Sequence, residues 1–258
     1  MKDQTIEIPT RAGRMETFVT HPEQGGPFPP VILYMDVWGV RDVLFDLARR
    51  VAAVGYYVLV PDFYYRQGRI RSDFRDENGR AISIMKLAPE LREKVLAPME
   101  KLSDETVMED TADIFTFLDG QNVVKAGAAG CFGYCMGGRH VLQAAARFPG
   151  RFKASASLHG TYIISDQPDS PHLATAKMQG EVYCGFAETD PFAPMSMVGE
   201  FGQLMKTSTA RYSVEVHPGA EHGYALPDRD VYLQRAAERD WEMMFAMFFR
   251  KIPPAFQK

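Results

Sequence analysis

The chain has 258 residues, of which 46% are hydrophobic and 24% are charged, the composition of an ordinary globular protein. Its 29 basic and 33 acidic residues give a net charge of −4, so no strong field favours nucleic acid or an anionic membrane. The apolar runs are far shorter than a bilayer-spanning helix needs, and the first ten residues are charged where a signal segment would be apolar. Three widely spread cysteines favour a reduced compartment. We therefore expect a cytoplasmic protein with no membrane or nucleic-acid partner.

Short β-rich runs alternate with helical patterns along the chain. Strands are predicted over 5–9, 15–20, 31–35, 56–60, 126–132, 154–158, 182–186 and 212–216, and the first two are expected to be antiparallel. Apolar spacings of three and four predict helices over 40–54, 104–118, 136–148 and 232–250. This alternation predicts a single α/β domain over 1–258, with a mostly parallel twisted sheet of about eight strands and helices on both faces.

Residues 66–103 interrupt this alternation directly after the strand that ends at Val60. They are highly charged and are broken by prolines. A connection of this length is more often a cover over a functional site than a simple link. We therefore expect a lid-like insertion here, with a solvated surface excursion as the alternative.

The segment most informative about chemistry is Gly133-Tyr134-Cys135-Met136-Gly137-Gly138, which joins a predicted strand to a predicted helix. A nucleophile between glycines in this context sits on a sharp turn that only small neighbours tolerate. The turn would place the Cys135 sulfur at a helix N-terminus, where negative charge is favoured. The backbone N–H of Met136, the next residue, would then point toward a developing oxyanion. A buried structural cysteine is the alternative reading.

Acid and base candidates follow the cysteine in the expected order. Asp190 lies in the loop after the strand over 182–186, and His222 lies between Gly219 and Gly223 after the next strand. His217 competes for the role of base but ends a strand, so loop geometry favours His222. The remaining histidines, His21, His140 and His172, are expected to be structural or superficial. The order of these groups predicts nucleophilic catalysis with a Cys135, His222 and Asp190 triad.

The sequence resembles the dienelactone hydrolase family of α/β-hydrolases. The resemblance rests on VILYMDVWGV, YVLVPDFY, GYCMGG, the DP of AETDPF and AEHGY, which together extend over most of the chain. It implies an α/β-hydrolase fold and a carboxymethylenebutenolidase-type hydrolase of esters or lactones that acts through a cysteine acyl-enzyme. It also implies that the N–H of Val37 is the second oxyanion donor. The family usually has a glutamate where this chain has Asp36, which we expect to restrain Cys135, to relay its proton, or to cap the next helix.

The family also implies how a substrate carboxylate would be held. Two arginines usually bind it, and Arg66 resembles one of them, whereas Arg229 is near but does not match the other position. Arg69, Arg71, Arg75 and Arg80 lie within reach in the predicted lid. The aromatic and imidazole side chains expected to shape an otherwise apolar pocket are Tyr34, Trp38, Tyr64, Tyr134, His159, Phe192 and Tyr224.

A thiolate leaves more readily than an alkoxide or an amine, so esters and lactones with enol or phenol leaving groups should acylate Cys135 best. The sequence therefore predicts a hydrolase that is a monomer or homodimer, acts on a small-molecule ester or lactone, and needs neither cofactor nor metal. Two alternatives are a non-catalytic binding or regulatory module with this fold and a thiol redox protein that uses Cys131 with Cys135. Cys131 lies within a predicted buried strand, which suits redox exchange poorly.

Overall fold

The predicted alternation of strands and helices is present in the computed structural model, which describes residues 1–254. One eight-stranded sheet has the strand order β1-β2-β4-β3-β5-β6-β7-β8. The strands are β1 Lys2–Thr10, β2 Gly13–His21, β3 Pro30–Tyr34, β4 Tyr57–Pro61, β5 Ala129–Tyr134, β6 Phe152–Leu158, β7 Glu181–Thr189 and β8 Arg211–Glu221. β2 pairs antiparallel with β1 and β4, and all other neighbours are parallel, which confirms the predicted fold class.

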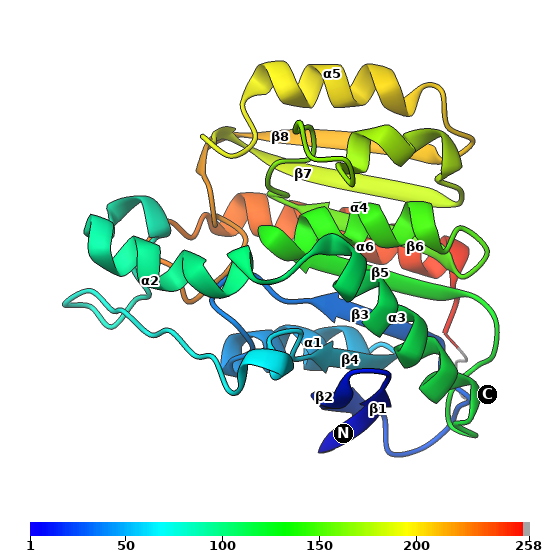
Figure 1. Cartoon of the computed structure of the whole chain (residues 1–258). Helices are drawn as coiled ribbons and strands as arrows, with labels where there is room; N and C mark the ends of the chain where they lie inside the picture. The colour runs from blue at the N-terminus through cyan, green and yellow to red at the C-terminus, as the bar shows by residue number, and fades with distance from the viewer. Residues whose placement is uncertain (255–258) are drawn as a thin grey trace.

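Helices cover both faces of this sheet (Figure 1). They are α1 Asp42–Ala52, α2 Pro89–Glu100, α3 Asp104–Asp119, α4 Met136–Arg147, α5 Met195–Met205 and α6 Gln234–Lys251. On one face, Arg50 of α1 forms an ion pair of 2.6 Å with Glu238 of α6. On the other face, Arg139 of α4 pairs with Asp104 of α3 at 2.7 Å. The helices therefore bury the sheet on both faces, and ion pairs connect neighbouring helices within each layer.

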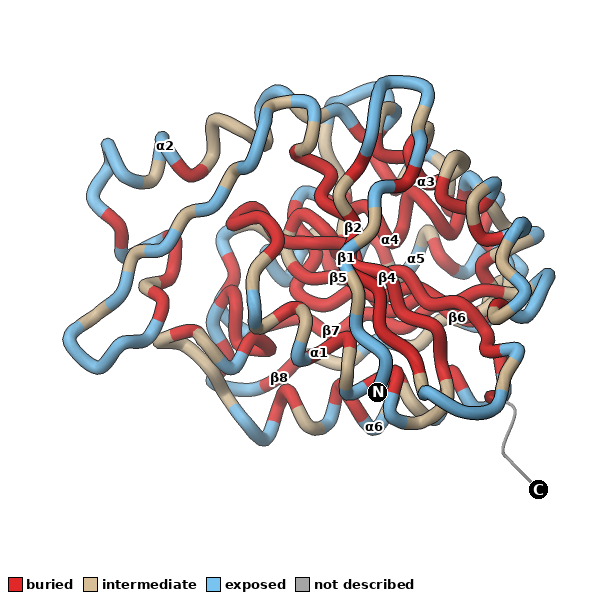
Figure 2. The backbone as a smooth tube through the Cα atoms, turned by 90° about the horizontal axis from the view of Figure 1, so that it is seen from below, coloured by how far each residue is buried: buried red, intermediate tan, exposed pale blue. Residues whose placement is uncertain are grey.

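The central strands are buried because almost every residue in them is apolar. All five residues of β3 and all five of β4 are buried, and Figure 2 shows the buried backbone running through the middle of the molecule. Because β3 to β8 are parallel, their carboxyl ends meet at one edge of the sheet. Within residues 1–254, none of the helices has the length and apolar character needed to span a bilayer.

The segment 66–103 lies beyond this edge and contains α2, which projects from the body of the molecule (Figure 1). Its apolar side chains, among them Ile84, Leu87 and Val95, form a small cluster with Val37 and Trp38. The segment thus packs against the loop after β3 through a small apolar cluster of its own. Helix α5 was not predicted, because two glycines interrupt the apolar spacing of its sequence.

Candidate active site

The turn between β5 and α4 holds Cys135 in a conformation that few residues adopt. Its φ is 57° and its ψ is −119°, and it is the N-cap residue of α4. A Cβ atom on Gly133 would lie 2.5 Å from the carbonyl oxygen of Gly137, and one on Gly137 would lie 2.2 Å from that of Tyr34. Only glycine fits at either position, so the two glycines flanking Cys135 permit the turn that presents its sulfur.

His222 and Asp190 meet at the same edge of the sheet. The Nδ1 atom of His222 lies 2.7 Å from Oδ2 of Asp190, and both side chains are buried. The other carboxylate oxygen of Asp190 accepts the backbone N–H of Phe192 at 2.9 Å, which fixes the orientation of the carboxylate. Because Nδ1 is engaged with Asp190, Nε2 is the ring nitrogen left for Cys135.

The charge state of His222 follows from these neighbours. Burial alone would lower its pKa, but the interaction with Cys135 and hydrogen bonds with Asp190 and Cys135 outweigh it and raise the pKa to about 10. The imidazole of His222 is therefore a hydrogen-bond partner of both Asp190 and Cys135.

The loop after β3 reaches the turn from the other side, and Asp36 organises it. The Asp36 carboxylate accepts the N–H of Trp38 at 3.1 Å, and its backbone carbonyl accepts the N–H of Gly39 at 3.2 Å. Two arginine nitrogens of Arg41 lie 2.6 and 2.9 Å from the carboxylate oxygens. Asp36 does not cap α1, because the N-cap residue is Arg41 and it makes no side-chain cap.

Burial would raise the pKa of Asp36, but Arg41 and Arg229 outweigh it and lower the pKa below its usual value. A carboxylate that holds its charge this firmly is a poor acceptor for a relayed proton. The proposed roles of Asp36 in restraining Cys135 and in relaying its proton stay predictions. The observed contacts show that Asp36 fixes the loop that contains Val37.

Arg229 is the functional candidate that sequence analysis did not place. Its side chain is 3% exposed, and its guanidinium lies 4.1 Å from the centroid of the Trp38 ring and 3.4 Å from Asp36. Its Nη1 atom is buried without a hydrogen-bond partner among the described residues. A buried donor without a partner is costly, which points to a ligand that would satisfy it. The only sequence signal was its position seven residues after His222.

Cys135, His222 and Arg229 line one small cavity, together with His159 and Trp38. The cavity has a volume of about 20 Å³. Ser83 and Ile84 of the segment 66–103 also line it. The segment is held down where the N–H of Ala81 bonds to the carbonyl of Asp228 at 2.7 Å. This arrangement brings part of the segment against the cavity at Cys135, whose side chain is half-buried.

Several residues expected near the substrate lie elsewhere. Arg66 donates two hydrogen bonds of 2.6 and 2.8 Å to Asp110 and is absent from the described lining of the Cys135 cavity. Tyr134 and Tyr224 are fully buried, and the hydroxyl of Tyr224 donates to Asp240 of α6. Tyr64 is buried beside the site, where its hydroxyl donates to the carbonyl of Val37 at 3.1 Å.

The competing histidines have partners of their own. Nε2 of His217 lies 2.7 Å from Asp240, and Nε2 of His140 lies 3.2 Å from Asp104. Neither lines the cavity at Cys135 in the part of the chain that the structure describes. Residues 1–254 also contain no group of three or more His, Cys, Asp or Glu side chains arranged to hold a metal ion.

Comparisons with known proteins show the family to which the chain is similar. A family model described as the dienelactone hydrolase family matches residues 15–252. The Synechocystis protein named "Putative carboxymethylenebutenolidase" is 26% identical over 251 residues, covering 96% of each chain. The Bradyrhizobium protein named "Probable 2-oxo-3-(5-oxofuran-2-ylidene)propanoate lactonase" is 24% identical over 242 residues, covering 92% of this chain and 89% of the relative. A crystal structure from Klebsiella pneumoniae, named a "Putative Dienelactone Hydrolase", superposes with a TM-score of 0.81 at 25% identity, covering 96% of this chain and 98% of the other.

Proposed function

The chain belongs to the dienelactone hydrolase family and is a hydrolase of carboxylic esters or lactones, and from that premise we propose that it acts through a cysteine acyl-enzyme. The proposed triad is Cys135, His222 and Asp190. The observation that carries this proposal is the position of His222, which bonds to Asp190 through Nδ1 and has its pKa raised by Cys135. In this arrangement His222 can exchange a proton with the Cys135 sulfur.

In the proposed acylation step, the Cys135 thiolate attacks the carbonyl carbon and a carbon–sulfur bond forms. The developing oxyanion accepts hydrogen bonds from the backbone N–H groups of Met136 and Val37. The carbon–oxygen bond then breaks, and the leaving oxygen takes the proton of His222. In deacylation, neutral His222 removes a proton from water, the hydroxide adds to the thioester, and the thiolate departs. Asp190 keeps the imidazole in one orientation throughout.

Arg229 suggests what the leaving group carries. It lines the same cavity as His222, which must reach the leaving oxygen, and its Nη1 lacks a partner among the described residues. A carboxylate would satisfy that guanidinium by charge and by hydrogen bonding. We therefore propose substrates whose enol or phenol leaving half bears a carboxylate, held by Arg229. In this role Arg229 replaces the expected Arg66, whose guanidinium is committed to Asp110.

We also propose that residues 66–103 form a lid that opens for each substrate. The cavity at Cys135, about 20 Å³, has room for about one water molecule. No ester fits there unless Ser83 and Ile84 move. A closed lid would exclude bulk water from the thiolate and strengthen its interaction with His222.

The two alternative functions have weaker support. The thiol of Cys131 is fully buried and burial raises its pKa to about 12, so exchange with Cys135 lacks an accessible thiolate. A non-catalytic module would leave the contacts that join Cys135, His222 and Asp190 without a use.

The test is hydrolysis of aryl esters, enol-lactones and thioesters by the wild type, Cys135→Ala and Cys135→Ser. We expect the wild type to form a covalent acyl adduct visible by mass spectrometry, Cys135→Ala to lose all burst and turnover, and Cys135→Ser to lose at least about 100-fold in kcat/KM. Cys184→Ala, which removes a thiol buried away from the site, is the matched control and should keep full activity. Turnover that survives in Cys135→Ala would refute the acyl-enzyme.

A further inference from the structure

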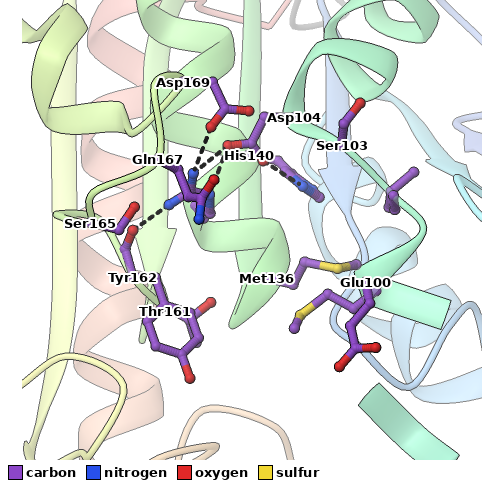
Figure 3. A pocket seen from close by; sticks show the side chains of 13 residues that line it. Glu100, Ser103, Asp104, Met136, His140, Thr161, Tyr162, Ser165, Gln167 and Asp169 are labelled. Atoms are coloured by element: carbon purple, nitrogen blue, oxygen red, sulfur yellow. Dashed lines mark hydrogen bonds and ion pairs between the residues drawn. The ribbon is translucent and has the colours of Figure 1, made fainter. Parts of the chain in front are cut away.

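A second and much larger cavity lies next to the nucleophile turn. It has a volume of about 530 Å³, within the range of small-molecule sites. Figure 3 shows the loop after β6, with Thr161 and Tyr162, on one side, and the chain between α2 and α3, with Glu100 and Ser103, on the other. Met136 lies between the two walls (Figure 3).

Residues that line this cavity contact Cys135, which is not itself part of the described lining. Met136 follows Cys135 in the chain, and the N–H of Thr161 bonds to the carbonyl of Cys135 at 3.3 Å. Met99, which also lines the cavity, packs in the same apolar cluster that Cys135 borders. A group attached to the Cys135 sulfur could therefore enter the cavity without crossing the body of the protein.

The position of His222 shows which half of a substrate the cavity would hold. The leaving oxygen must take a proton from His222, so the leaving group has to lie beside that ring. His222 lines the small cavity with Arg229 but is absent from the described lining of the large one. The large cavity is therefore on the side of the carbonyl carbon that stays bound to sulfur.

The charged side chains that line the large cavity restrict the kind of acyl group that it can hold. The Arg139 guanidinium is occupied by the Asp104 carboxylate at 2.7 Å and by the carbonyl of Tyr162. Burial would raise the pKa of Asp104, but His140 and Arg139 lower it well below its usual value, so this carboxylate is charged as well. Glu100 and Asp169 add two further carboxylates at the rim. An anionic acyl group would meet repulsion here, whereas the side chains of Met99, Leu102 and Met136 suit an apolar one.

We propose that this cavity is an acyl subsite that takes a neutral, mainly apolar acyl group of medium length. The proposal rests on the proposed acyl-enzyme at Cys135 and names the substrate class of that site. A complete substrate would then carry its carboxylate on the leaving half, near Arg229, and an uncharged chain or ring on the acyl half.

The test uses p-nitrophenyl esters, which share one leaving group and differ in the acyl group: acetyl, octanoyl and the anionic adipoyl half-ester. Leu102→Trp should fill the cavity from the α2–α3 side, and Gln167→Trp should fill it from the opposite loop. Lys101→Trp, at an exposed neighbour outside the cavity lining, is the matched control. The readout is kcat/KM, which reports acylation.

In the wild type, we expect octanoyl to exceed adipoyl by at least about tenfold in kcat/KM. Leu102→Trp and Gln167→Trp should each reduce the octanoyl value at least about tenfold, and change the acetyl value less than about twofold. Lys101→Trp should change neither. Equal losses for acetyl and octanoyl, or no loss for either, would overturn the acyl subsite while leaving the hydrolase intact. Absence of turnover in the wild type on all three esters would instead count against the proposed function.

Discussion

The imidazole of His159 is fully buried between His222 and Tyr224, with ring centroids 4.9 and 5.5 Å away. Both of its ring nitrogens lack a hydrogen-bond partner among the described residues. Burial lowers the pKa of His159 well below its ordinary value, and the nearby charges of His222 and Arg229 lower it further. The His159 side chain is therefore neutral in the folded protein at neutral pH.

This shift predicts an acid-dependent loss of stability. The unfolded chain binds a proton at His159 near pH 6.5, and the folded chain does not, so the free energy of unfolding falls as pH drops below about 6.5. The slope is about 1.4 kcal/mol per pH unit. Above that pH the group contributes nothing. Urea unfolding of the wild type and His159→Asn from pH 7.5 to 5.5 should give curves that diverge below 6.5, with the wild type falling more steeply. Parallel curves would mean that His159 is already protonated in the fold.

Sequence analysis could predict the positions of those residues that are placed by a turn directly after a strand. Cys135, Asp190 and His222 each follow a strand directly, so strand prediction was enough to bring them to one edge. Arg66 and Arg229 depend on side-chain direction, which tertiary packing decides. Asp110 lies on α3, far along the chain from Arg66, and no local sequence pattern predicts the ion pair between them.

At the scale of elements, the segment 66–103 is attached to the loop after β8 by a few identifiable contacts. Asp230 accepts the N–H of Ser83 at 2.9 Å and forms an ion pair of 3.0 Å with Lys86. The carbonyl of Ala81 also accepts the N–H of Asp230 at 3.1 Å. These contacts hold the proposed lid over Cys135.

Replacing Asp230 by alanine should therefore loosen the lid. We expect Cys135 in Asp230→Ala to react with iodoacetamide roughly fivefold faster than in the wild type, because a charge-assisted bond and an ion pair are lost. Burial raises the pKa values of Cys131 and Cys184 to about 12, so neither competes for the reagent. Arg75→Ala is the control, since Arg75 pairs with Asp73 inside the segment itself. An unchanged rate in Asp230→Ala would show that these contacts do not hold the lid closed.

Strands were predicted more securely than the elements that cover them. Apolar runs in the centre of a parallel sheet are continuous, and their ends are marked by glycine, proline and aspartate. The antiparallel strands β1 and β2 extend beyond their predicted ends because partner pairing, and not composition, decides where a hairpin stops. Helix α5 carries two glycines and depends on packing against β7 and α4.

At the scale of the whole molecule, Asp240 of α6 joins three parts of the chain. It is 1% exposed and accepts the hydroxyl groups of Tyr183 and Tyr224, each at 2.6 Å. His217 of β8 lies 2.7 Å from the same carboxylate. Tyr224 follows His222 by two residues, so the network ties the loop of the proposed base to β7, β8 and α6.

Loss of this carboxylate should destabilise the entire fold. We expect Asp240→Asn to lower the free energy of unfolding by about 3 kcal/mol, because an amide cannot accept from three donors as a carboxylate does. The urea transition should stay single, with an unchanged slope and a lower midpoint. Glu242→Gln on the same helix, whose partner Arg239 is exposed, is the control and should change stability little. A loss confined to activity would show that Asp240 serves only the loop.

The small cavity beside Cys135 has a consequence for the timing of catalysis. If Ser83 and Ile84 must move for a substrate to reach the sulfur, as proposed for the lid, then binding and release each depend on a motion of the segment 66–103. Each catalytic cycle would then contain one lid motion before the chemical steps and one after them. Solvent viscosity would slow these motions without affecting proton transfer. A lid that fits more tightly would lower the turnover rate but would protect the thioester better from other nucleophiles.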